Sequence, residues 1–135
     1  MNFAERNRLG VLLLVSLAAS LIHFAHNAEF LGEYPNLPSW LSRSDVYLAW
    51  IGLAVLGLCG FALYFRGRQF LGLSLIGLYA AFGFDGLLHY SRAAFAAHSV
   101  TMNFTIWFEV VAAAVLLVAV VYAAVKRLHS RVIDA

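Results

Sequence analysis

Four long apolar runs dominate the pattern of hydrophobic and polar positions along the chain. They cover about residues 9–29, 45–65, 70–90 and 101–125, and a helix needs roughly 20 apolar residues to cross about 30 Å of hydrocarbon. The pattern predicts an all-α fold in which one domain, residues 1–135, forms an integral membrane four-helix bundle. A basic head before an apolar run is also typical of a signal peptide. The continuous apolar length and the lack of a small-residue cleavage site favour a retained helix.

The segments between the runs predict how the helices connect. Residues 30–43 contain both prolines, and we expect them to lie along the membrane surface with Tyr34 and Trp40 as interfacial anchors. Residues 66–69 are a short basic turn, so the second and third helices should be antiparallel neighbours. Residues 91–100 form the other connection, on the same side as residues 30–43.

Lysine and arginine are concentrated at one end of this predicted bundle. Only two of the nine, Arg43 and Arg92, lie at the other end. The remaining seven lie in the head, the short turn and the tail: Arg6, Arg8, Arg66, Arg68, Lys126, Arg127 and Arg131. Because cytoplasmic segments carry an excess of basic residues, the distribution predicts that both termini are cytoplasmic. We expect a bacterial-type inner (plasma) membrane.

The overall composition agrees with a membrane protein. Hydrophobic residues make up 63% of the chain and charged residues 12%, about half the charged fraction of a soluble domain. A net charge of +2 is too small to indicate binding of nucleic acid. The single cysteine, Cys59, lies within an apolar run and cannot form an internal disulfide.

Ionisable side chains inside three of the runs fall at one depth. At about 1.5 Å per helical residue, His23 and Asp85 lie about 21 and 22 Å from the inner edge, and Glu109 about 12 Å below the outer edge. Each charge placed in lipid costs roughly 2.5–3.5 kcal/mol. Such groups therefore face the bundle interior, where they pair with another polar group or serve a function. We expect the three side chains to converge on a pocket open to the outside, with His26 and His89 just above them.

Imidazoles combined with carboxylates are ligands that zinc, copper and iron prefer. The cluster therefore predicts a transition-metal site in a small membrane metalloenzyme or metal-handling protein. The expected ligands are His23, His26, Asp85, His89 and Glu109. Asp85 and Glu109 are the candidates for any catalysis, although the sequence leaves open whether there is turnover. Five further polar residues are expected to support the ligands: Ser20, Asn27, His98, Asn103 and Thr105.

Three alternatives stay open. The same groups suit a metal-free acid–base or proton-relay pocket for a lipid-like ligand such as an isoprenoid, a sterol or a quinone. Two histidines on different helices, such as His23 or His26 with His89, can hold a b-type haem, although the nearby carboxylates disfavour it. The polar groups can also be hydrogen bonds between helices, for example Asp85 with Arg92, in a structural subunit of a homo-oligomer or of a larger membrane complex.

Overall fold

The computed structural model describes residues 3–133, which form helices and short connections without any strand. The α-helices are α1 (Phe3–Glu29), α2 (Arg43–Phe65), α3 (Gln69–Phe82), α4 (His89–Arg92) and α5 (Val100–Ile133). Three 3₁₀ turns lie in the connections: η1 (Leu31–Glu33), η2 (Asp85–Leu88) and η3 (Phe95–Ala97). Four helical stretches are long and apolar enough to span a membrane, which confirms that part of the fold prediction: Ala4–Glu29, Arg43–Phe65, Gln69–Arg92 and Val100–Ser130.

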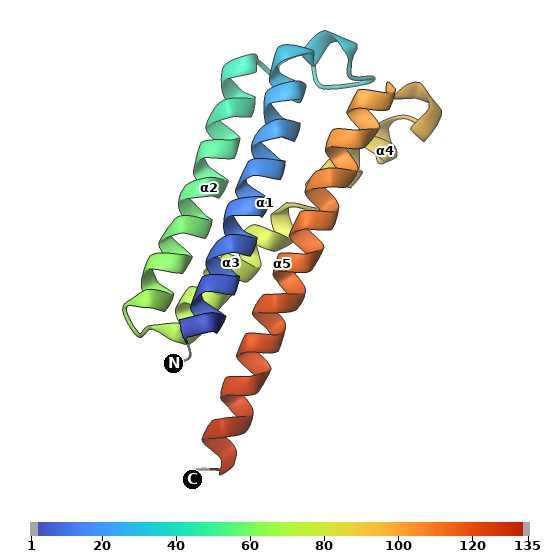
Figure 1. Cartoon of the computed structure of the whole chain (residues 1–135). Coiled ribbons are helices and arrows are strands. Elements are labelled where there is room, and N and C mark those ends of the chain that lie inside the picture. Colours follow the sequence, from blue (N-terminus) through green and yellow to red (C-terminus); the bar gives the residue numbers. More distant parts are fainter. Residues whose placement is uncertain (1–2, 134–135) are drawn as a thin grey trace.

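The helices run side by side, with both described chain ends and the turn between α2 and α3 at one end of the molecule (Figure 1). The long connections before α2 and before α5 lie at the opposite end. We call the end with the termini the basic end, since seven of the nine basic residues of the sequence belong to it. The other is the site end.

The first and last helices extend beyond the predicted apolar runs. α1 begins at Phe3, and α5 continues to Ile133. The extensions are held together at the basic end, where Arg127 forms an ion pair of 2.5 Å with Glu5 and donates hydrogen bonds to Tyr64 and Gln69. One guanidinium thus connects four helices, α1, α2, α3 and α5. A charged head that was expected to precede the first helix is part of it.

The third predicted helix, residues 70–90, is confirmed as a candidate span, but the prediction that it is one continuous α-helix is wrong. α3 ends at Phe82, and the chain continues through Gly83 into η2 and then α4. Glycine is a poor helix former, and here it also permits close packing: a Cβ at Gly83 would lie 2.5 Å from the Cβ of Ala113 on α5. Asp85 and Gly86 therefore belong to the tighter turn η2, and His89 begins the separate short helix α4.

Glycines also set the packing of α2 against α3 at the basic end. A Cβ at Gly72 would lie 2.5 Å from the backbone nitrogen of Tyr64 and 2.6 Å from the carbonyl oxygen of Gly60, so the two backbones touch. Towards the site end, the chain after α3 leads away from α2, and α4 lies apart from α2 (Figure 1). This divergence makes room for the candidate site between them.

Candidate functional site

A buried histidine and a buried glutamate face each other between α1 and α5. The Nε2 atom of His23 lies 3.8 Å from the Oε2 atom of Glu109, and each side chain is only 3% exposed. Thr105, one turn before Glu109 on α5, donates its hydroxyl hydrogen to the carbonyl of Met102 at 3.0 Å. The Thr105 oxygen therefore accepts from Nδ1 of His23, 3.4 Å away. With its proton on Nδ1, the neutral His23 ring directs the lone pair of Nε2 towards Glu109.

The Glu109 carboxyl has unused hydrogen-bonding capacity. Among the described residues its buried Oε2 atom has no hydrogen-bond partner. Gly86 of η2 lies beside it: a Cβ at Gly86 would be 3.6 Å from Glu109 Oε2 and 3.6 Å from His23 Nε2. Because buried polar atoms nearly always have a partner, an unpartnered carboxyl oxygen beside a glycine indicates where a ligand group can bind.

Two further histidines continue the polar region away from this pair. Asn27 donates its side-chain amide hydrogen to Nε2 of His89 at 3.3 Å, and the buried N–H at Nδ1 of His89 has no acceptor among residues 3–133. His98 donates from Nδ1 to the carbonyl of Ala94 at 3.1 Å, and the buried lone pair on its Nε2 has no donor in the same part of the chain. The ring centroids of His89 and His98 are 6.1 Å apart. The two rings thus offer one free N–H and one free lone pair.

The loop between α1 and α2 covers these histidines. Tyr34 was expected as an exposed membrane-interface anchor, but it is 3% exposed, whereas Trp40 is 75% exposed. The Tyr34 hydroxyl lies 2.9 Å from Nδ1 of His26, and its ring centroid is 4.9 Å from that of His89. Burial raises the pKa of Tyr34 to about 12. Tyr34 is therefore a site residue that sequence reasoning missed, because a tyrosine near a helix end is more typical of the interfacial belt.

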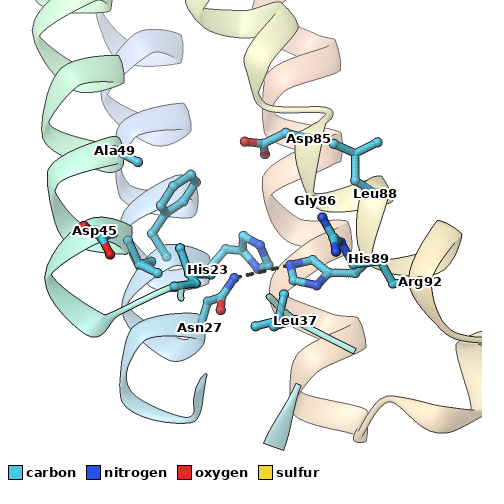
Figure 2. Close-up of a pocket in the computed structure, with 13 residues that line it drawn as sticks. His23, Asn27, Leu37, Asp45, Ala49, Asp85, Gly86, Leu88, His89 and Arg92 are labelled. Atoms are coloured by element: carbon cyan, nitrogen blue, oxygen red, sulfur yellow. Dashed lines mark hydrogen bonds between the residues drawn. The ribbon is translucent and has the colours of Figure 1, made fainter. Parts of the chain in front are cut away.

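A cavity of about 210 Å³ opens between α1, α2 and the η2–α4 segment (Figure 2). Figure 2 shows the carboxylate of Asp85 extending from η2 towards α2 across this space. The polar side of the lining consists of His23, Asn27, Asp45, Asp85, His89 and Arg92. The apolar side consists of Phe24, Leu37, Leu41, Val46, Ala49 and Leu88. The cavity is therefore amphipathic.

Asp85 does not form the ion pair with Arg92 that the sequence allowed, as far as the described residues are concerned. Arg92 instead donates to the backbone carbonyl of Asn36 at 3.4 Å, and the Asn36 side chain donates to the carbonyl of Arg92 at 2.9 Å. These two hydrogen bonds attach the loop that contains Tyr34 to the end of α4.

The structure brings most of the sequence-predicted residues into one region. His23 and Glu109 form the pair, and Asp85 and His89 line the cavity beside His23. His26 instead contacts Tyr34. Of the five supporting residues, Thr105 and Asn27 bond directly to site histidines, and His98 lies next to His89.

The other two supporting residues lie farther out. Asn103 donates to the carbonyl oxygens of Phe95 and His98, so it holds the loop that carries His98. Ser20 interacts with Tyr79 and Trp50, each at 3.1 Å, and donates to the carbonyl of Leu17 one turn earlier. Ser20 therefore belongs to a separate set of contacts between helices.

Within residues 3–133, no three histidine, cysteine, aspartate or glutamate side chains are grouped so that they could hold a metal ion. The predicted ligand set of His23, His26, Asp85, His89 and Glu109 is spread over the pair, the cavity wall and the Tyr34 contact. The transition-metal and haem assignments therefore stay predictions.

No protein-family model, curated protein or solved structure matches the chain. The guide to function is consequently the chemistry of the site.

Proposed function

We propose that this chain is an integral membrane protein that binds the polar end of a lipid-like ligand and exchanges a proton with it through Glu109 and His23. The observation that carries the proposal is the buried pair itself, with Nε2 and Oε2 3.8 Å apart and the carboxyl oxygen unpartnered among the described residues. Ionisable groups are expensive in a membrane interior, so a pair that is not fully hydrogen-bonded there favours function over packing.

The proton positions define the chemistry of the pair. The Nε2 atom of His23 carries the lone pair of the ring. When both His23 and Glu109 are uncharged, the proton that the two residues can exchange therefore lies on the Glu109 carboxyl. A ligand atom beside Gly86 can take this proton, while a neighbouring ligand atom can give a proton to His23 Nε2. That arrangement is suited to general acid–base catalysis or to reversible protonation of the ligand. His89 and His98, with a free N–H and a free lone pair, can pass a proton onwards through one bridging hydroxyl group.

The cavity restricts the class of ligand. Its volume of about 210 Å³ is below the roughly 300–1,000 Å³ of pockets that enclose whole drug-sized ligands. Only one end of a longer ligand fits, with its polar atoms on the His23 and Asp85 side and its apolar part against Val46 and Leu88. We infer an isoprenoid-like or quinone-like molecule that enters between α2 and η2 while its chain remains in lipid.

The polar region is confined to one half of the bundle. The core towards the basic end is largely apolar, with Leu13, Leu73, Ile76 and Leu116 fully buried between the site and the Arg127 contacts. Its two buried tyrosines, Tyr64 and Tyr79, hydrogen-bond to Glu5 and Ser20. We infer that the chemistry takes place on one side of the membrane, without proton conduction across it. From the positive-inside rule we infer that the basic end, with both termini, faces the cytoplasm and that the site faces the outside.

Three ten-carbon probes with different head groups test the proposal: decanol, decylamine and decanoate, each added to the full chain in phosphatidylcholine nanodiscs. Decanol and decylamine can donate a hydrogen bond to Glu109 Oε2, so they should raise the Tm, because a ligand that binds the folded state stabilises it. Decanoate should raise the Tm less than the other two probes, because it cannot donate to Oε2 and can only accept the proton of Glu109. Binding of decylammonium should also release about one proton per protein, which a pH indicator detects in weakly buffered solution.

Two variants and one control make this test specific. Glu109→Gln should abolish the proton release, and Gly86→Leu should fill the binding space and remove the Tm shift. Glu33→Gln removes an exposed carboxylate at the same end of the molecule and should behave like the unmodified protein. Equal Tm shifts and equal proton release in Glu109→Gln and Glu33→Gln would contradict the proposal.

One observation favours the metal alternative. His98 donates Nδ1–H to a backbone carbonyl and keeps the Nε2 lone pair free, an arrangement typical of metal-binding histidines. Stoichiometric zinc, copper or iron in the purified protein, lost in His98→Ala, would support that alternative, and a Soret band would indicate haem. Proton release in a protein that elemental analysis finds free of metal would favour the acid–base function.

A further inference from the structure

A groove between α1 and α5 lies at the basic end, away from the acid–base cavity. Its polar part is a cavity of about 220 Å³ lined by Ala4, Glu5, Arg8, Tyr122 and Lys126. A second cavity of about 430 Å³ is lined by Arg8, Leu12, Val115, Val118, Ala119 and Tyr122. Because both cavities share Arg8 and Tyr122, they form one groove with a cationic end and an apolar length. We call it the basic-end groove.

The cationic end of the groove carries an uncompensated positive charge. The guanidinium of Arg8 lies 5.6 Å from the ring centroid of Tyr122, and no carboxylate of the described chain forms an ion pair with it. Lys126 Nζ is 3.6 Å from Glu5, but that carboxylate is already bound by Arg127 at 2.5 Å. An anionic group entering the groove would therefore meet Arg8 first and Lys126 second. Glu5 competes with such an anionic group for Lys126 but not for Arg8.

The apolar part has the length of a lipid chain. Lys126 and Val115 are eleven residues apart on α5, which corresponds to about 16 Å at 1.5 Å per residue. This is about half of the roughly 30 Å hydrocarbon thickness, and so the depth of one leaflet. An extended peptide in the same place would leave backbone polar groups unsatisfied in lipid, since the lining side chains of this part are mostly apolar.

We propose that the basic-end groove binds an anionic phospholipid, with the phosphate beside Arg8 and Lys126 and one acyl chain along Leu12 and Val118. Basic pockets between membrane helices are suited to anionic head groups, and each basic residue near the membrane surface contributes a factor of about five in affinity. This site depends on the membrane placement in the proposed function, but it is independent of the acid–base pair.

The test uses the full chain in nanodiscs of phosphatidylcholine and phosphatidylglycerol in a 3:1 ratio. Lipid that stays bound after transfer to mild detergent is identified by native mass spectrometry. The unmodified protein should retain one phosphatidylglycerol in preference to phosphatidylcholine. The double variant Arg8→Gln/Lys126→Gln should retain it about 25-fold less. The control double variant Arg66→Gln/Arg68→Gln removes the same charge at the same end, but outside the groove, and should retain it normally.

A further pair of variants tests the contact with the acyl chain separately from the contact with the head group. Ala119→Phe fills the apolar part while Arg8 and Lys126 remain, so it should also reduce retention, whereas Val121→Phe, outside the groove, should not. Inorganic phosphate at 10 mM should not displace the lipid, because it lacks the acyl chain.

Three outcomes would overturn the lipid site: equal losses in the two double variants, retention without preference for phosphatidylglycerol, or full displacement by phosphate. Glu109→Gln serves as a reference. It should retain the lipid normally even if the acid–base proposal fails, so the two proposals fail independently.

Discussion

Replacing Gly72 by alanine adds one methyl group where the backbones of α2 and α3 touch. The new Cβ would lie 2.5 Å from the nitrogen of Tyr64, about 0.9 Å short of the 3.4 Å at which ordinary contact begins. Both close neighbours, the Tyr64 nitrogen and the Gly60 oxygen, are backbone atoms, so no side chain can rotate away. Overpacking of this kind costs about 1–3 kcal/mol, and the better helix propensity of alanine returns at most about 1 kcal/mol. We expect a net loss of about 1–2 kcal/mol in the free energy of unfolding.

The same substitution at Gly52 is the matched control. No heavy atom lies within 4 Å of the Cβ position there, so Gly52→Ala should be neutral or should stabilise by up to about 1 kcal/mol. Unfolding by titration with sodium dodecyl sulfate, followed by far-ultraviolet circular dichroism, gives both values. Since η2 follows α3, Gly72→Ala should also reduce the decanol-induced Tm shift through Gly86. Equal stabilities of the two variants would show that the glycine contact does not set the packing of α3.

Four further predictions follow from the contacts described above. Tyr34 should ionise near pH 12 instead of near 10, so its contribution to stability is fully present below pH 10 and is lost as the pH rises to about 12. Absorbance at 295 nm should show a late phase that Tyr34→Phe reduces by the signal of one tyrosine. Arg127→Gln leaves the nearly buried Glu5 carboxylate with only Lys126 and Tyr64 as partners, since the Arg127 and Glu5 side chains are 13% and 12% exposed, and should cost about 2–4 kcal/mol. Arg43→Gln, whose pair with Glu29 is 65% and 40% exposed, should cost less than about 1 kcal/mol in the same chemical unfolding experiment. Vesicles that contain the protein and an enclosed pH dye should show no proton flux above that of vesicles without protein, because the core towards the basic end is largely apolar. A proton flux that Glu109→Gln abolishes would contradict this prediction.

The sequence predicted the features that depend on local pattern and depth. Apolar length alone identified the four candidate spans, because backbone hydrogen bonds in lipid must be made within a helix or a closed barrel. A rise of about 1.5 Å per residue was enough to place His23 and Glu109 at similar depth on different helices. Their pairing then followed from the rule that ionisable side chains turn away from lipid.

Only the tertiary structure decided how these groups face one another. After Phe82, where α3 ends, Gly83 packs so closely against Ala113 of α5 that a Cβ would not fit, and this neighbour is distant in the sequence, whereas the local apolar pattern predicted a continuous helix. Tyr34 is buried because its loop folds back over His89.

The positions of the protons on the histidine rings likewise could be inferred only from the folded structure. The sequence names the histidines, but the partners of their ring nitrogens come from other helices and loops, as the contact between His23 and Thr105 shows. Depth along one helix is a local quantity that a sequence specifies. The direction of a lone pair depends on atoms that only the folded chain brings together.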